Sequence, residues 1–212
     1  MRRSGSRLWC IALAAAGAVA ALACALPPAA LAEGDAAAAG AAAPKHPRPG
    51  SRGGQNLDFL FGALKAAPDA ASAKIVENRI LALWLASGSD TADLLMTRVK
   101  AAVDAKDIDL ALRLLDAVVE IKPDYVEAWN RRATLHFMQK DFGSAMLDLR
   151  QVLAREPRHF GALVGLGLVM QELGEDKRAL EAFRRALEIH PYLPRVPDLI
   201  KDLSAKIEGR AI

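Results

Sequence analysis

The sequence predicts an all-helical protein that is built largely from repeated helix pairs. Apolar residues make up 52% of the 212 residues but aromatic residues only 5%, so the core must consist mainly of Ala, Leu and Val. These residues suit closely packed helices better than sheets. Landmark residues also recur every 34 positions, namely Pro123, Pro157 and Pro191, and Ala111, Ala145 and Ala179. A fixed period of this length indicates a tandem array of one supersecondary unit.

Residues 1–32 have the organisation of a signal peptide. Arg2, Arg3 and Arg7 form a basic start, an apolar run extends over residues 8–26, and small residues surround Leu31 before a cleavage site that would leave Glu33 first. This order of charge, apolar run and small residues predicts export, in a bacterium to the periplasm. The alternative is an uncleaved anchor, because an apolar run of this length could just span a bilayer.

Removal of this leader would change the composition of the protein. Both cysteines, Cys10 and Cys24, lie within it, so the mature chain would contain no thiol for a disulfide, a metal site or a nucleophile. The leader also carries three arginines and no acid, so the formal net charge would fall from +3 to 0. The balance of charge therefore does not indicate a nucleic-acid partner.

A linker and a first pair of helices are predicted between the leader and the repeats. Residues 33–56 are rich in Ala, Gly and Pro, which predicts a disordered tether. Residues 57–90 show two apolar stripes at helical spacing, one through Leu60 and Leu64 and the other through Ile80 and Trp84. This pair does not follow the period of 34, so it is either a degenerate repeat or an N-terminal cap.

Residues 91–193 contain three repeats, at 92–125, 126–159 and 160–193. Each is predicted to be two amphipathic helices, joined at Lys106-Asp107, Lys140-Asp141 and Gly174-Glu175. A small residue in the first helix, such as Gly167, lets the two helix axes approach closely, and the terminal proline ends the second helix. Residues 194–212 then predict a capping helix with one apolar and one polar face.

The landmark residues of these units resemble the tetratricopeptide repeat. In the second and third units a large residue is followed by a small residue, an alanine, a second large residue and a proline. In the second unit these are Trp129, Ala133, Ala145, Leu149 and Pro157, and in the third unit they are Leu163, Gly167, Ala179, Phe183 and Pro191. The resemblance implies a right-handed α-solenoid and a protein that binds other proteins. Exported members of the family look like scaffolds or assembly factors of the bacterial cell envelope.

Catalytic and metal-binding motifs are absent from the sequence. The four histidines do not form a metal-binding pair, and neither a nucleophile elbow nor a phosphate-binding loop is present. Gly165 and Gly167 lie within a helical pattern, which predicts a close helix contact rather than a nucleotide turn. We therefore expect neither an enzyme nor a cofactor or metal.

The resemblance also implies a binding groove lined by the first helices of successive units. Carried over by position, the candidate protein-binding residues are Met96, Lys100, Glu127, Asn130, Arg131, Thr134, Phe137, Val164, Leu168 and Gln171. They predict a groove with a mixed polar entrance and an apolar far end, suited to a peptide or a partner subunit. The alternative for Val164 and Leu168 is that they pack on the capping helix.

The leading hypothesis is thus a non-catalytic scaffold or adaptor of the bacterial envelope. Contact with a membrane is expected only through the leader, if it is retained. The alternatives are a membrane-tethered structural protein with an uncleaved anchor and, less favoured, a regulator of an envelope enzyme.

Overall fold

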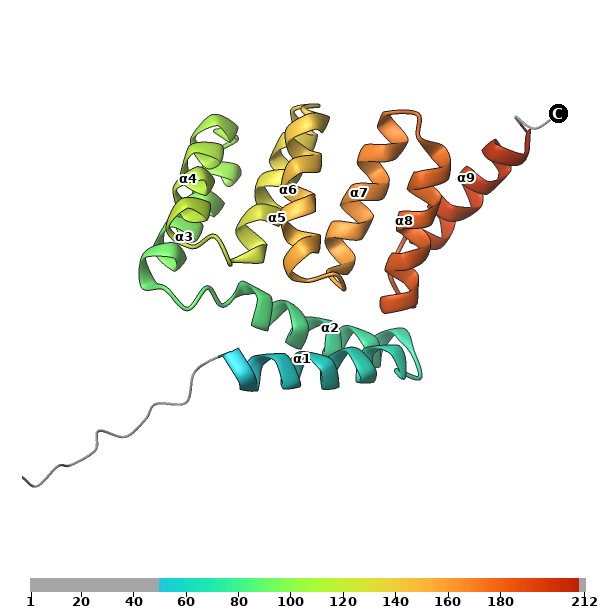
Figure 1. Ribbon diagram of the computed structural model, residues 1–212, viewed down its shortest axis with the longest axis horizontal. Coiled ribbons are helices and arrows are strands. Elements are labelled where there is room, and N and C mark those ends of the chain that lie inside the picture. The colour runs from blue at the N-terminus through green and yellow to red at the C-terminus, as the bar shows by residue number, and fades with distance from the viewer. Residues whose placement is uncertain (1–49, 210–212) are drawn as a thin grey trace, which may run out of the picture. The chain divides into compact units, whose positions relative to one another are not determined.

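The computed structural model describes residues 50–209, and these residues form helices and the turns between them (Figure 1). The helices are α1 (Gly50–Lys65), α2 (Ala70–Leu85), α3 (Asp90–Asp104), α4 (Ile108–Ile121), α5 (Val126–Met138), α6 (Phe142–Arg155), α7 (Phe160–Glu172), α8 (Asp176–Ile189) and α9 (Val196–Gly209). The predicted all-helical class is confirmed. The predicted leader, and the predicted linker up to residue 49, lie outside the described residues.

Helix α1 begins earlier than the sequence predicted. Gly50 is its first residue, whereas the apolar stripe that predicted the helix starts at Leu57. Residues 50–56 are therefore helical and not part of a linker. Once the stripe from Leu60 to Leu64 is packed and the helix is nucleated, each further residue adds a backbone hydrogen bond at low cost, even where its helix propensity is poor.

Helices α3 to α8 form three antiparallel pairs joined by nearly identical turns. Lys106 and Lys140 both have φ 61°, and Gly174 at the same place in the third pair has φ 78°. This left-handed residue ends the first helix, as in a common C-terminal cap. The next residue begins the second helix, because the Asp107 and Asp141 carboxylates accept hydrogen bonds from the N–H groups of Leu110 and Ser144.

The close contact between α7 and α8 depends on Gly167. A Cβ atom at this position would lie 2.4 Å from Cε1 of Phe183, whose side chain is fully buried. Ala145 in α6 and Ala179 in α8, which occupy equivalent positions in the second helices of their pairs, are also fully buried. Small residues therefore bring the helix axes together, as the sequence predicted.

Helix α9 packs on α8 and ends the row of helix pairs (Figure 1). Val196 and Leu203 are buried against a cluster that includes Leu180 and Phe183 of α8. The Lys206 ammonium lies 2.8 Å from the Asp176 carboxylate at the start of α8. The apolar face of α9 is thus covered, while Lys201 and Asp202 on its other side are exposed.

Helices α1 and α2 pack against an edge of the second and third pairs. Their apolar residues form a cluster with Phe160 at the start of α7, together with Val126 of α5 and Ile189 of α8. The Trp84 ring is stacked on the His159 ring, with 4.0 Å between centroids. Figure 1 shows α1 and α2 running across the ends of these pairs instead of standing beside α3 as a further pair.

Polar contacts at the turns between repeats attach α1 and α2 to this edge. The Arg158 guanidinium lies 2.6 Å from the Asp58 carboxylate and 4.3 Å from the centre of the Phe61 ring. The His190 Nε2 atom lies 3.4 Å from the Glu77 carboxylate, and the Tyr192 hydroxyl donates to the Ala67 carbonyl. Residues about a hundred positions apart in the sequence are thereby joined.

None of the helices in residues 50–209 is sufficiently long and apolar to cross a membrane.

Candidate functional site

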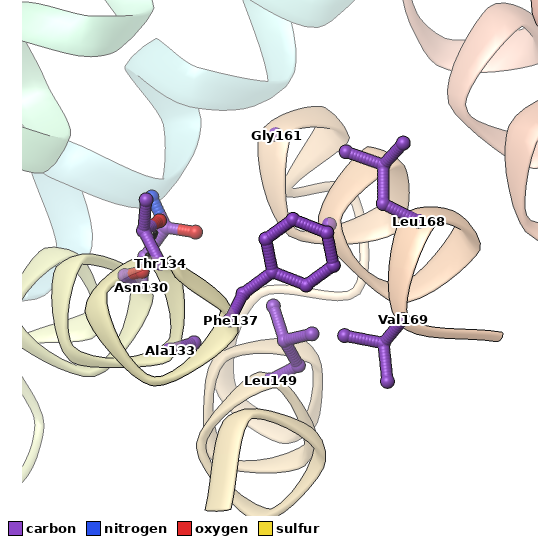
Figure 2. A pocket seen from close by; sticks show the side chains of 9 residues that line it. Asn130, Ala133, Thr134, Phe137, Leu149, Gly161, Leu168 and Val169 are labelled. Atoms are coloured by element: carbon purple, nitrogen blue, oxygen red, sulfur yellow. Dashed lines mark hydrogen bonds between the residues drawn. The ribbon is translucent and has the colours of Figure 1, made fainter. Parts of the chain in front are cut away.

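The second and third helix pairs form a small hollow where α5 faces α7 (Figure 2). We call it the α5/α7 hollow. Its volume is about 80 Å³, and its lining residues are Asn130, Ala133, Thr134 and Phe137 of α5, Leu149 of α6, and Gly161, Gly165, Leu168 and Val169 of α7. The structure therefore brings together four of the predicted groove residues, Asn130, Thr134, Phe137 and Leu168.

The α5/α7 hollow combines an apolar wall with a polar rim. The Phe137 ring lies between α5 and α7 in Figure 2, and its centroid is 5.7 Å from that of Phe142. On the rim, the Asn130 amide donates to the Glu127 carboxylate over 3.3 Å, and the Thr134 hydroxyl donates to the Asn130 carbonyl over 3.0 Å. Both groups can form further hydrogen bonds with a ligand.

Glycines on α7 keep the hollow open. At Gly165, a Cβ atom would lie 3.3 Å from Cδ2 of Leu149, and at Gly161 it would contact the His159 ring. A larger side chain at either position would therefore occupy the space between α5 and α7. Gly165 was not among the predicted groove residues, because its spacing predicted only a helix contact.

A second hollow lies where α3 faces the start of α5, and we call it the α3/α5 hollow. Its volume is about 250 Å³, and it is lined by Leu85, Asp93, Met96, Thr97, Lys100, Tyr125 and Arg131. Three predicted residues, Met96, Lys100 and Arg131, meet here. The Lys100 ammonium is 2.6 Å from Asp104 and the Arg131 Nε atom is 3.2 Å from Glu127, so both cations are paired with acids of their own helix.

Glu127 links the two hollows. Its carboxylate accepts hydrogen bonds from Asn130 beside one hollow and from Arg131 beside the other. It also lies 3.6 Å from the Nε2 atom of His159, and this nitrogen atom is buried without a hydrogen-bond partner among the described residues. Glu127 therefore orients Asn130 and Arg131, the polar side chains of α5 at the two hollows.

Tyr125 closes one side of the α3/α5 hollow, and the sequence analysis did not identify it. Its hydroxyl donates to the Leu85 carbonyl over 2.9 Å, which ties the end of α2 to the start of α5. Burial and the nearby Glu127 carboxylate raise the pKa of Tyr125 to about 12. Its burial depends on its contact with α2, which the repeat pattern of the sequence does not indicate.

The remaining predicted residues, Val164 and Gln171, line neither of these two hollows. Val164 and Leu168 are partly buried against the cluster formed by α8 and α9. Leu168 thus contributes both to this core and to the α5/α7 hollow, whereas Val164 belongs to the core. Gln171 lies near the end of α7, where its carbonyl accepts a hydrogen bond from Gly174.

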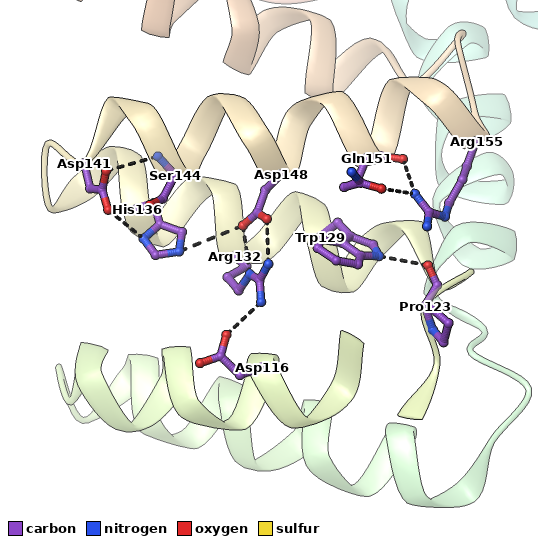
Figure 3. A network of polar contacts seen from close by, with 10 residues as sticks. All are labelled: Asp116, Pro123, Trp129, Arg132, His136, Asp141, Ser144, Asp148, Gln151 and Arg155. Atoms are coloured by element: carbon purple, nitrogen blue, oxygen red, sulfur yellow. Dashed lines mark hydrogen bonds and ion pairs between the residues drawn. The ribbon is translucent and has the colours of Figure 1, made fainter. Parts of the chain in front are cut away.

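A different face of α5 carries a charged network (Figure 3). The Arg132 guanidinium forms two hydrogen bonds with the buried Asp148 carboxylate, at 2.8 and 2.7 Å, and a third with Asp116 at 2.7 Å. The hydrogen bond with Asp148 raises the pKa of Arg132 further above its ordinary value. The network joins α4, α5 and α6 through a charge-assisted bidentate pair, so we assign it a structural role.

The histidines of the described residues lie in packed surroundings. His136 is within 3.6 Å of Asp141 and 3.9 Å of Asp148, and His159 and His190 are buried under α1 and α2. Residues 50–209 contain no group of three or more His, Cys, Asp or Glu side chains that could hold a metal ion. The two hollows, which bring together seven of the predicted groove residues, are the candidate site.

Comparisons with known proteins agree with this architecture. The tetratricopeptide repeat model matches residues 96–149 and 145–194. A TPR repeat-containing protein of Rhizobium etli is 40% identical over 155 residues, which cover 73% of this chain and 76% of the relative. A small glutamine-rich tetratricopeptide repeat-containing protein of Saccharomyces cerevisiae is 25% identical over 139 residues, covering 64% of this chain and 40% of the relative.

Solved structures of low sequence identity share the fold. The first TPR domain of Spaghetti (RPAP3), bound to an HSP90 peptide, is 19% identical with a TM-score of 0.55, covering 57% of this chain and 95% of that one. The Sgt2 TPR domain from Aspergillus fumigatus is 21% identical with a TM-score of 0.54, covering 58% and 83%. With the 40% identity to the Rhizobium protein over most of both chains, these findings show that the chain belongs to the tetratricopeptide repeat family.

Proposed function

We propose that the protein is a non-catalytic adaptor that binds an extended segment of a partner protein on the surface formed by α3, α5 and α7. The observation that carries this proposal is the α5/α7 hollow, where Asn130 and Thr134 lie next to the apolar side chains of Phe137 and Leu168. Proteins of this family are typically binding modules without catalytic activity, and the Spaghetti domain binds a peptide of its partner.

The two hollows indicate the chemistry of the bound segment. The α5/α7 hollow is small and mainly apolar, so it suits one aliphatic side chain. The Asn130 amide can pair with the backbone of the segment, because an amide both donates and accepts. The α3/α5 hollow has Lys100 and Arg131 beside Asp93, so a polar stretch of the same segment would continue there. Backbone hydrogen bonds and one buried side chain are a recurring basis of peptide recognition.

We further propose that the adaptor works in the bacterial cell envelope. The support is the leader at residues 1–32, with its basic start, apolar run and small residues before Glu33. Export would place the repeats in the periplasm, whereas an uncleaved leader would hold them at the membrane. The intact mass of the protein from the envelope fraction distinguishes the two, because cleavage leaves a chain that starts at Glu33.

Site-specific photo-crosslinking in intact cells tests the binding surface. A photoreactive residue replaces Thr134, which is exposed on the rim of the α5/α7 hollow, and a matched control replaces Arg150, which is exposed on α6. We expect a partner to be captured from Thr134 and not from Arg150. A Leu168→Asp substitution in the Thr134 probe should reduce this capture, because it places a charge in the apolar hollow.

Capture from both positions with equal yield, or from Arg150 alone, would contradict binding in the α5/α7 hollow. Capture from Thr134 that the Leu168→Asp substitution does not reduce would also contradict it. Far-ultraviolet circular dichroism of each variant checks that the helices are retained.

A further inference from the structure

One end of the row of helix pairs has an uncovered apolar face. α3 and α4 stand at this end, while α9 covers the other (Figure 1). The helices that precede α3 in the sequence, α1 and α2, pack instead against α5, α7 and α8. Leu94 is 55% exposed and Leu110 is 37% exposed, so no helix of the described residues covers this side of the first pair.

This end face is apolar with a charge on each side. It consists of Leu94, Arg98 and Ala101 from α3, Ala105 that caps this helix, Asp107 from the turn, and Leu110 from α4. A hollow of about 440 Å³ lies between the two helices, with Arg98 and Asp107 among its lining residues. Within residues 50–209, Arg98 forms no ion pair, and one oxygen of Asp107 accepts the N–H of Leu110.

We infer that a second copy of this chain docks on the end face, with the two α3 helices antiparallel about a two-fold axis near Arg98 and Ala101. The distribution of side-chain size favours this arrangement. The large Leu94 lies in the first half of α3 and the small Ala101 and Ala105 lie towards its end. An antiparallel pair sets Leu94 of each copy over Ala105 of the other, so large residues meet small ones.

The charges are complementary in the same arrangement. Side chains on a helix lean towards its N-terminus, so Arg98 leans towards the C-terminal end of the partner's α3. The partner's Asp107 lies just beyond that end, and the symmetry gives two such pairs. Two antiparallel helices also place opposite ends of their dipoles next to each other.

The two-fold arrangement uses the same face on both copies, so it closes as a dimer. Continued stacking of copies end to end would require an apolar face at the far end as well. There α9 presents exposed Lys201 and Asp202, and its apolar side is already packed on α8.

Sedimentation velocity of the full chain, purified as it accumulates in its host, tests the dimer. We expect a monomer–dimer equilibrium, and Leu94→Glu should raise its dissociation constant at least about tenfold, because an unpaired carboxylate would be buried at the contact. The matched control is Leu147→Glu on α6, at a residue that is 64% exposed and outside the end face, which should leave the equilibrium unchanged.

Cysteine pairs test the antiparallel arrangement, in a chain whose Cys10 and Cys24 are replaced by alanine. Leu94→Cys and Ala105→Cys together should give a disulfide-linked dimer after mild oxidation, whereas either substitution alone should not. Within one chain the two positions are about 16 Å apart along α3, which is too far for a disulfide.

A chain that stays monomeric at all concentrations would overturn the proposal. So would a dimer that Leu94→Glu does not weaken, or a disulfide-linked dimer formed equally by a single cysteine variant. If the protein is a monomer and the thiol introduced by Leu94→Cys is protected from a maleimide, the end face would instead be covered by residues 1–49 of the same chain.

Discussion

Gly167 determines how closely the two helices of the third pair approach. The position where its Cβ would lie is 2.4 to 2.8 Å from three carbon atoms of the Phe183 ring. This ring is fully buried, so it cannot move aside without disturbing the core around it. The cost of a glycine within a helix is therefore offset by the contact that it permits.

At the residue scale we predict that Gly167→Ala lowers the free energy of unfolding by about 1–3 kcal/mol, because the added methyl group overpacks the contact with Phe183. Urea denaturation followed by circular dichroism measures the change. The matched control is Gly62→Ala in α1, where a Cβ would meet no atom within 4 Å. This control should be stabilising by about 0.5–1 kcal/mol. A Gly167→Ala protein as stable as the original would show that Phe183 has room to shift.

At the scale of the elements, Tyr125 joins two parts of the fold. Its hydroxyl bonds the last carbonyl of α2 while its ring is buried beside the start of α5. With the contacts of Trp84 and Arg158, it attaches the first two helices to the repeats. The position of α2 depends on side chains from three turns, namely Tyr125, His159 and His190.

The raised pKa of Tyr125 makes this attachment sensitive to alkaline pH. The unfolded chain loses the tyrosine proton near pH 10, whereas the folded chain retains it until a pH of about 12. The folded state therefore favours the protonated form. The contribution of Tyr125 protonation to the free energy of unfolding is complete below pH 10 and is lost as the pH rises from 10 to 12. The loss is up to about 2–3 kcal/mol at the upper limit.

Tyr125→Phe tests this dependence. It removes the hydrogen bond with Leu85, worth about 0.5–1.5 kcal/mol, at every pH, but it leaves no group to titrate. We expect the original protein to be more stable at pH 9 and to lose this advantage towards pH 12. Chemical denaturation of both proteins at several pH values measures the difference, in which contributions from other groups cancel. Parallel curves would contradict the role of Tyr125.

At the scale of the whole molecule, each helix pair depends on its neighbours. Repeat proteins gain much of their stability from the interfaces between units, and a terminal unit needs a polar outer surface. Here α9 provides that surface at one end, and it covers Leu180 and Phe183 of α8. The other end lacks such a cover among the described residues, which is the basis of the proposed dimer.

We predict that deletion of residues 194–212 lowers the melting temperature and causes association, because it exposes the apolar cluster on α8. Thermal melting and light scattering over a range of concentrations measure both effects. The control is Lys201→Ala with Asp202→Ala, which alters only the exposed side of α9 and should change neither. A truncated chain that remains a monomer with an unchanged melting temperature would show that α9 is not a cap.

The sequence by itself determined the helices of the repeats and the turns between them. The 34-residue period reflects contacts within a pair and between neighbouring pairs, so Lys106, Lys140 and Gly174 appear at equivalent places in the sequence and in the fold. The resemblance to the tetratricopeptide repeat, carried over by position, placed Asn130, Thr134, Phe137 and Leu168 on the groove side of the first helices, and the structure joins them in one hollow. Local amphipathic patterns are sufficient to predict these helices and turns, because their contacts lie within one helix pair or between neighbouring pairs.

Only the tertiary structure decided where α1 and α2 pack and which side chains complete the site. The contact of Asp58 with Arg158 joins positions 100 residues apart, and nothing in the period of the repeats indicates it. The places of Tyr125 and Gly165 in the walls of the hollows also depend on contacts with other helices, which the period does not indicate. Periodic patterns identify the apolar face of a helix, but the choice among the surfaces that could cover it is made by packing over the whole molecule.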